Sequence, residues 1–394
     1  MSSYSSIFDS KIQDSMKIGM KMFRDFPGSR GAAINAIKSF PAAKKRRGSM
    51  AEQGIIVPPL LIISVTDRCN LNCMGCYSRA NSVKTTNTEG IANTAGTTNA
   101  ASNKAGDANN TAGAEDTSDA TEARSGPELH PGEMTRPQID KLLAEVADAG
   151  TSIVLLAGGE PLLHKEWLDA AAACKNLLYL VFTNGTLMDE SYADFFSKNR
   201  NLIPLFSLEG EPAVTDNRRG QTVSDQIEKA RQLMSERKIP FGMSITTGAH
   251  NFDEVVNTEF LNHSYDKGCR VAVYSEYVPV DVTDDLDVLS ESMKQALNDF
   301  CIKESERGDM LAIAFPGDEE IYGGCLAAGR GFAHISSKGD LEPCPFAAYS
   351  DSNVLTTSYT AALVSPLFRQ LREQSHLLRE GPGGCALRKQ NESI

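Results

Sequence analysis

The sequence predicts an α/β protein: a partial (βα)6 TIM-like barrel with a small α+β domain at its C-terminal end. Two observations carry this prediction. Apolar, strand-like runs alternate with amphipathic, helix-like runs between residues 57 and 280, apart from one insertion. Strict alternation of this kind is typical of a parallel sheet with helical crossovers. After residue 306 the alternation stops, and short Gly-, Ser- and Cys-containing segments follow.

Six strands and five intervening helices are predicted within the barrel. The strands are the apolar runs at 57–66, 152–159, 178–185, 203–210, 240–248 and 270–280. The helices lie at 135–150, 166–176, 189–199, 224–238 and 252–268. Thr135 is the predicted N-cap of the first helix and Gly150 its C-terminal stop. Six such units close most of a barrel, whose site is expected at the carboxyl ends of the strands.

The chain divides into three predicted parts, 1–55, 56–284 and 285–394. Residues 1–55 form an N-terminal helical extension, and 56–284 form the barrel. Within the barrel, residues 81–128 have no aromatic residue and are mostly Asn, Thr, Ala, Gly and Ser, which predicts a disordered insertion. Residues 285–394 hold a helix near 285–306, a β-hairpin at 332–343 and a helix at 366–380.

The N-terminal extension has two features of its own. Apolar residues at helical spacing predict one amphipathic helix; these are Phe8, Ile12, Met16, Met20 and Phe23. We expect it to pack on the barrel, and a helix on a membrane surface is the alternative. The basic run Lys44 to Arg47 is interpreted as a solvated cluster, with contact to an anionic partner as the alternative.

Charge and composition restrict the function. The formal net charge of −12 and the pI of about 5.1 argue against a broad nucleic-acid-binding face. No stretch reaches the roughly 18 apolar residues of a membrane span, so membrane association is not expected. The N-terminus lacks the pattern of a secretory signal. We therefore expect a cytoplasmic protein, in which cysteines stay reduced.

Three cysteines lie in one short loop directly after the first predicted strand. Cys69, Cys73 and Cys76 have the spacing C-x3-C-x2-C. Thiolates suit zinc and iron–sulfur clusters, but structural zinc sites are usually closed by four ligands. Three cysteines on a [4Fe–4S] cube leave one iron open to a further ligand. An iron–sulfur cluster is therefore favoured over zinc or core thiols.

Polar motifs follow the next strands at the same rim. "GGEP" follows the second strand, "TNGT" the third and "SLEG" the fourth, and Arg218 and Arg219 come shortly after. Adjacent glycines let a backbone approach a ligand closely. The carboxylate of Glu160 suits an ammonium group, and an arginine can hold a carboxylate with its fork of N–H groups.

With these motifs the sequence resembles the radical S-adenosylmethionine (SAM) family, over about residues 57–280 without the insertion. The resemblance implies that Cys69, Cys73 and Cys76 hold a [4Fe–4S] cluster whose open iron binds SAM. The residues implied at SAM are Gly158, Gly159, Glu160, Pro161, Asn184, Ser207, Arg218, Arg219 and Tyr77. The first three would contact the amino group, Asn184 and Ser207 the ribose, and one arginine the carboxylate. Where the family often has an aromatic residue this chain has Gly75, so we expect Tyr77 to supply the ring.

The C-terminal part resembles the SPASM and twitch domains that follow many radical SAM barrels. Cys325 and Cys344 enclose a spacer with Gly339 five residues before the second cysteine. Only Cys385 follows, which favours a twitch-like domain with one auxiliary iron–sulfur cluster held by these three cysteines. A structural zinc or buried thiols are the alternative. Cys174, Cys269 and Cys301 lie away from the rim and are interpreted as core thiols.

The resemblance also implies the reaction. One electron, from a donor such as ferredoxin or flavodoxin, would cleave SAM to a 5′-deoxyadenosyl radical, which abstracts hydrogen from a substrate. The favoured substrate is a small molecule or cofactor precursor. A maturase acting on a peptide or protein is the alternative. A non-catalytic iron–sulfur electron carrier is a third candidate function, and the SAM motifs argue against it.

Other polar residues near the rim are candidates without an assigned role. Tyr274, Glu276 and Tyr277 end the sixth strand and are expected to face the substrate or the adenosine, with Tyr277 on the opposite face from the other two. Glu209 and Glu211 could take part in proton transfer. No general base is assigned.

Overall fold

The computed structural model describes residues 26–80, 132–279, 287–315 and 324–374, together with 12–13, 378 and 387. The predicted helix at 8–23, apart from residues 12 and 13, lies outside these ranges. The predicted insertion at 81–128 and Cys385 lie outside them as well.

The described residues form one curved sheet of nine strands, in the order β7-β6-β5-β4-β3-β2-β1-β8-β9. The strands are β1 (Leu60–Ser64), β2 (Ile153–Ala157), β3 (Leu178–Thr183), β4 (Leu202–Leu208), β5 (Phe241–Thr247), β6 (Cys269–Glu276), β7 (Leu311–Phe315), β8 (Phe332–Ile335) and β9 (Leu341–Glu342). Strands β1 to β6 are parallel neighbours in chain order. The predicted partial barrel is thus confirmed, and β7 adds a parallel strand that was not predicted.

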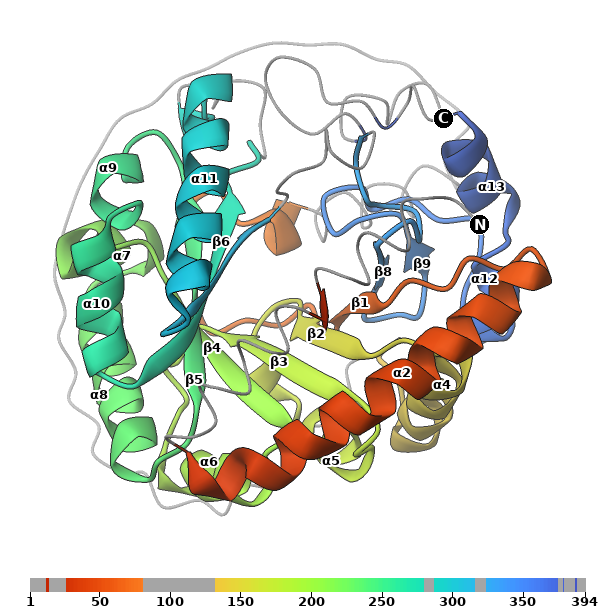
Figure 1. The fold of residues 1–394 in the computed structure, drawn as a ribbon, viewed down its shortest axis with the longest axis horizontal. Coiled ribbons are helices and arrows are strands. Elements are labelled where there is room, and N and C mark those ends of the chain that lie inside the picture. The colour runs from red at the N-terminus through yellow and green to blue at the C-terminus, as the bar shows by residue number, and fades with distance from the viewer. Residues whose placement is uncertain are drawn as a thin grey trace, which may run out of the picture.

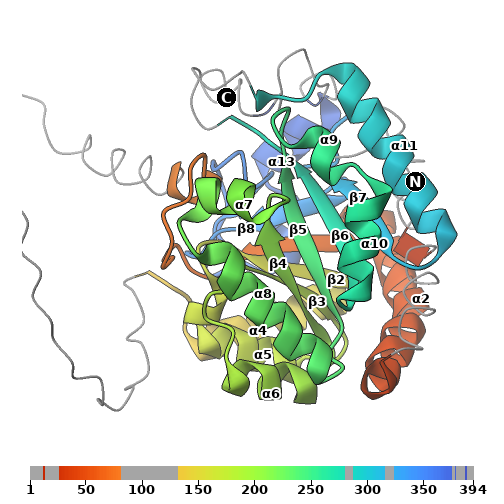
Figure 2. The ribbon, with the colours of Figure 1, turned by 90° about the vertical axis from the view of Figure 1, so that its left-hand side faces the viewer.

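Helices cover the outer side of this sheet (Figures 1 and 2). They are α4 (Arg136–Ala149), α5 (Lys165–Ala173), α6 (Glu190–Lys198), α8 (Val223–Glu236) and α10 (Thr258–Asp266). Helix α4 begins with a capping box between Thr135 and Gln138 and ends at left-handed Gly150, as predicted. The helix predicted at 252–268 is two helices, α9 (Phe252–Val255) and α10, because the Asn257 side chain caps α10.

Helix α2 (Arg30–Glu52) follows a short 3₁₀ turn, η2 (Pro27–Ser29). It was not predicted, and it holds Pro41, a residue that normally interrupts a helix. It packs against α4. Arg46 donates to the carbonyl of Ala147 at 3.1 Å, and buried Arg47 donates to the carbonyl of Gly150. Both carbonyls lie at the C-terminal end of α4, where a cation is favourable. The interpretation of this run as a solvated cluster is therefore wrong for its two arginines.

The C-terminal part continues the barrel sheet. Strand β8 pairs in parallel with β1, and β9 is antiparallel to β8, which confirms the predicted hairpin. Helix α11 (Glu291–Arg307) precedes it, and α12 (Tyr359–Ala362) and α13 (Pro366–Glu373) follow. Figure 1 shows β8, β9, α12 and α13 together beside β1. The cysteine loop, which follows β1, and the C-terminal part, whose β8 pairs with β1, are therefore neighbours in the fold.

The inner face of the barrel has an apolar floor and a polar rim. Ile203, Leu205, Val271 and Val273 form a buried cluster separate from the main core. One step towards the carboxyl ends of the strands, Ser207 lies beside Ser244 in the register of β4 and β5. Alternation along β1 and β8 places Ser64 and His334 on this inner face too. Among the described residues, no helix is both long and apolar enough to cross a membrane.

Candidate cluster and substrate site

The backbone of "GGEP" is hydrogen-bonded to the start of the cysteine loop. The N–H of Gly159 donates to Thr66 at 2.7 Å, and that of Glu160 donates to Arg68 at 2.8 Å. A Cβ on Gly159 would lie 1.9 Å from the Arg68 carbonyl oxygen, and Gly158 has a φ of +110°. No other residue type fits this approach. The two glycines therefore hold the cysteine loop at the carboxyl end of β1.

The carboxylate of Glu160 joins the second motif to the third. It accepts hydrogen bonds from Leu162 N at 3.0 Å, Thr183 Oγ1 at 2.7 Å and Asn184 N at 2.7 Å. Pro161 opens the 3₁₀ turn η3 (Pro161–Leu163), which presents the Leu162 N–H. Burial raises the pKa of Glu160, and these hydrogen bonds act against the rise. A carboxylate has about four acceptor positions, so three protein donors leave room for one more.

The amide of Asn184 points at the cysteine loop. Its Nδ2 lies 3.8 Å from Cys69 Sγ and 2.9 Å from Asn70 Oδ1. Its Oδ1 accepts hydrogen bonds from the backbone and side chain of Thr186. Asn184 was expected at the ribose, and the structure shows its amide bound to the loop that carries the thiols.

Arg218 and Arg219 end α7 (Pro212–Arg219), a helix that was not predicted. Both pair with fully buried Glu209, at 2.6 Å each. Burial alone would raise the pKa of Glu209, but Arg219 and Arg218 together lower it. Arg219 Nε donates to the other oxygen, Oε2, at 2.7 Å, so both oxygens of Glu209 are engaged, which is unsuited to the proton transfer considered for it. Glu211 is exposed, one residue before α7.

The arginine pair also faces the cysteine loop. The N–H of Met74 donates to the Arg218 carbonyl at 2.9 Å. Burial raises the pKa of the Cys73 thiol, and Arg219 and Arg218 counteract this. Cationic neighbours favour the thiolate form that a cluster requires.

An aromatic ring does lie against Gly75, but it belongs to Tyr277. Gly75 has a φ of +62°, and a Cβ there would lie 3.0 Å from two atoms of the Tyr277 side chain. Tyr77, expected to supply this ring, packs edge-on against Phe346 with ring centroids 5.2 Å apart. The ring next to the cysteine loop therefore comes from the end of β6.

Three further candidates at the carboxyl ends of β6 and β4 have different surroundings; they are Tyr274, Glu276 and Ser207. Tyr274 is fully buried and donates to the Val255 carbonyl at 2.9 Å, so the expectation that it faces the substrate is wrong. Glu276 lies 3.9 Å from Lys294. Ser207 is half-buried on β4, at the rim where it was predicted.

The thiols of the cysteine loop are accessible. Cys69 is exposed, and Cys73 and Cys76 are half-buried. Within the described ranges, no group of three or more His, Cys, Asp or Glu side chains is arranged around a single metal-ion position. A four-iron cube takes each thiolate on a different iron, so its ligands need not converge on one point. Three reachable thiols beside cationic groups fit such a cluster.

The remaining cysteines fall into two groups. Cys325 and Cys344 are buried in the C-terminal part, where the Ala328 N–H and the Pro343 carbonyl join their two segments at 3.1 Å. Cys269 and Cys301 are buried, and burial raises their pKa values to about 11 and about 12. These two are core thiols, as predicted, and Cys174 is half-buried.

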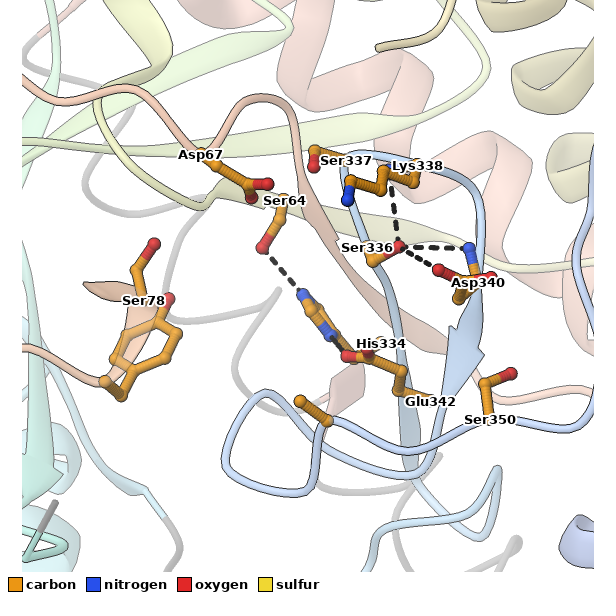
Figure 3. A pocket seen from close by; sticks show the side chains of 12 residues that line it. Ser64, Asp67, Ser78, His334, Ser336, Ser337, Lys338, Asp340, Glu342 and Ser350 are labelled. Carbon is orange, nitrogen blue, oxygen red and sulfur yellow. Dashed lines mark hydrogen bonds and ion pairs between the residues drawn. The ribbon is translucent and has the colours of Figure 1, made fainter. Parts of the chain in front are cut away.

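A cavity of about 300 Å³ opens beside the cysteine loop, on the inner face of the sheet where β1 pairs with β8. Buried His334 lies on its wall, with Nε2 2.8 Å from Ser64 Oγ and Nδ1 2.6 Å from Glu342 Oε2 (Figure 3). None of these three residues was predicted. The register of the predicted β-hairpin places His334 opposite Glu342. No feature of the sequence indicates that β8 pairs with β1.

Comparison with known proteins agrees with this geometry. The model of the radical SAM superfamily matches residues 63–261, which is half of the chain. An AdoMet-dependent heme synthase of Methanosarcina barkeri is 24% identical over 62% of this chain and 78% of its own length. An AdoMet-dependent heme synthase of Nitratidesulfovibrio vulgaris is 23% identical over 68% and 82%.

Solved structures share the fold. SuiB of Streptococcus suis bound to S-adenosylmethionine has a TM-score of 0.58 and 15% identity, over 89% of this chain and 74% of that one. Native anSMEcpe with bound AdoMet and a Cp18Cys peptide has a TM-score of 0.54 and 15% identity, over 82% of this chain and 84% of that one. With the family match over half of its length, this chain belongs to the radical SAM superfamily, whose members hold a SAM-binding [4Fe–4S] cluster.

Proposed function

We propose that this chain cleaves SAM reductively at a [4Fe–4S] cluster on Cys69, Cys73 and Cys76, and that the resulting 5′-deoxyadenosyl radical abstracts hydrogen from a small-molecule or cofactor-precursor substrate. The observation that carries the proposal is the cysteine loop, held by Gly158 and Gly159 at the carboxyl end of β1. In barrels of this type, sites lie at that end.

The rim residues would bind and orient SAM. We propose that Glu160 uses its remaining acceptor position for the ammonium group, and that Ser207 contacts the ribose. Arg218 and Arg219 keep N–H groups beyond those bound to Glu209, because a guanidinium has five, and one of them would hold the SAM carboxylate. The cluster supplies the electron that breaks the SAM sulfur–carbon bond.

The names of the relatives support one substrate class over the other. The two relatives reported above are named heme synthases. Heme is a cofactor, so these names support a cofactor precursor as the substrate. A peptide maturase is the second candidate, because anSMEcpe was solved with a peptide, although that likeness is one of fold. We propose a reducing compartment such as the cytoplasm and an electron donor of the ferredoxin or flavodoxin type.

An auxiliary cluster is proposed in the C-terminal part. Cys325 and Cys344 lie buried on neighbouring segments, and Cys385 would complete the set. The variant Cys325→Ala/Cys344→Ala/Cys385→Ala should lose iron beyond that of the first cluster and keep some SAM cleavage. Unchanged iron in this variant would show that there is no such cluster.

Anaerobic turnover tests the whole proposal. The reconstituted protein, reduced with dithionite or flavodoxin, is given SAM, and 5′-deoxyadenosine is measured by mass spectrometry. Fe-coproporphyrin III, the porphyrin in the name of a further relative from Methanosarcina barkeri that is 22% identical over 50% of this chain, and a cysteine-containing peptide serve as trial substrates for the two classes. If the porphyrin increases the amount of 5′-deoxyadenosine formed, the result supports a cofactor precursor as substrate. If only the peptide increases it, the result supports a peptide maturase. No 5′-deoxyadenosine under any condition would refute both.

A further inference from the structure

The hydrogen bonds among Ser64, His334 and Glu342 form a relay that the SAM motifs do not explain. The three residues come from β1, β8 and β9, and all are buried. Glu342 binds Nδ1 of the imidazole at 2.6 Å, and Ser64 Oγ lies 2.8 Å from Nε2. A carboxylate at Nδ1 fixes the tautomer that carries its proton there and leaves a lone pair on Nε2. The Ser64 hydroxyl then donates to Nε2.

The relay faces a cavity. Ser64, His334 and Glu342 all line the cavity of about 300 Å³ beside the cysteine loop, together with Tyr77 and Ser78, which directly follow Cys76. Figure 3 shows Ser64 and Glu342 at the two nitrogens of the His334 ring. A volume of this size fits a small molecule. The relay therefore ends at a space that lies next to the predicted site of the radical.

The cavity wall carries charged and hydroxyl groups that can bind a polar part of a ligand. Asp67, Lys338 and Asp340 bring charges of both signs to it, and hydroxyl groups supply most of the remaining polar atoms. Asp340 is already held by Ser336 and Asn353. Groups of this kind bind the polar, hydrogen-bonding end of a substrate better than an apolar part of it.

We propose that this cavity binds the polar reacting end of the substrate and that Ser64, His334 and Glu342 take up a proton from its O–H or N–H group. The substrate O–H or N–H bond breaks, its proton passes to Ser64 Oγ, and the Ser64 proton passes to His334 Nε2. The imidazolium is held by Glu342, and no electron changes hands. This role rests on the proposed function, in which a substrate in the barrel loses hydrogen. It adds the general base that sequence reasoning left unassigned.

Diisopropyl fluorophosphate tests the relay without knowledge of the substrate. If His334 accepts the Ser64 proton, Ser64 Oγ is nucleophilic: an Oγ–P bond forms, the P–F bond breaks, fluoride leaves and the proton passes to Nε2. The reconstituted enzyme is treated anaerobically and its peptides are analysed by mass spectrometry. Ser350 is the internal control, because it lines the same cavity but donates to backbone carbonyls.

Ser64 should be labelled faster than Ser350. His334→Gln, whose amide cannot take up a proton, should slow Ser64 labelling by about 100-fold, and Glu342→Gln should slow it less. A purely structural network predicts labelling of Ser64 that is no faster than that of Ser350 or that is unchanged by His334→Gln; either result would overturn the relay, whatever the unfolding temperature of the variant. SAM cleavage by the same wild-type sample is scored separately. Its absence contradicts the proposed function, while the labelling alone decides the relay.

Discussion

The side-chain amide of Asn184 lies 3.8 Å from the sulfur of Cys69 and is held there by Asn70 and Thr186. A hydrogen bond to a cluster thiolate stabilises the more negative, reduced cluster and so raises its reduction potential. Asn184→Leu should lower the potential by about 40 mV, the equivalent of about 1 kcal/mol for one electron. Redox titration followed by electron paramagnetic resonance measures this.

The matched control for that variant is Asn262→Leu, an exposed asparagine on α10. Its potential should equal that of the wild type. An Asn184→Leu potential equal to that of this control would show that the amide does not act on the cluster.

Gly159 should tolerate no side chain. A Cβ would lie 1.9 Å from the carbonyl oxygen of Arg68, whereas a Cβ on Gly31, in helix α2, meets nothing within 4 Å. Gly159→Ala should displace the cysteine loop and lower the iron content per chain. Gly31→Ala should keep its iron and be slightly more stable, because alanine loses less backbone entropy than glycine when a helix forms. Equal iron content in the two variants would contradict this account of the "GGEP" motif.

Glu209→Gln should destabilise the fold by roughly 3 kcal/mol, because it leaves two arginines without their buried partner. Burial opposes the ionised form, but the arginines hold the pKa of Glu209 below its ordinary value. A lowered pKa means that the stabilisation is complete above the ordinary pKa of glutamate and is lost only as pH falls through the lowered value. The loss should therefore be the same at pH 6 and pH 8 in thermal unfolding. Glu228→Gln, on a half-exposed carboxylate, is the control and should have a much smaller effect.

Gly75 and Tyr277 should be coupled. Gly75→Ala places a methyl group 3.0 Å from the Tyr277 ring and also strains a positive φ, so iron retention and SAM binding should fall. Adding Tyr277→Ala removes the clash and leaves only the strain, about 1–2 kcal/mol. The double variant should thus retain more iron than Gly75→Ala alone. If the iron losses of the two single variants simply add in the double variant, the Tyr277 ring does not constrain the cysteine loop.

Much of the barrel could be predicted, because alternating apolar runs and helix caps are local signals. Thr135 and Gly150 mark the ends of α4 in the sequence as they do in the structure. Helix α2 was missed because Pro41 normally ends a helix, and α2 is stabilised by tertiary contacts of Arg46 and Arg47. Tertiary packing overrides propensity in this way.

The site residues that could be predicted are, likewise, those marked by local sequence motifs. The cysteines and "GGEP" are contiguous motifs, so the sequence showed them. The positions of Tyr277 against Gly75 and of His334 beside Ser64 depend on how distant strands meet. Tyr77 was chosen for the ring because it is close in sequence, whereas the curvature of the sheet brings β6 to the loop.

The central claim is that the loop of Cys69, Cys73 and Cys76 holds the cluster that cleaves SAM. The most direct measurement compares iron content and 5′-deoxyadenosine formation in the wild type and in Cys69→Ala/Cys73→Ala/Cys76→Ala, both reconstituted anaerobically and reduced with dithionite. The variant should lose about four irons per chain and form no 5′-deoxyadenosine. A variant that keeps its iron, or still forms 5′-deoxyadenosine at the wild-type rate, would contradict the claim.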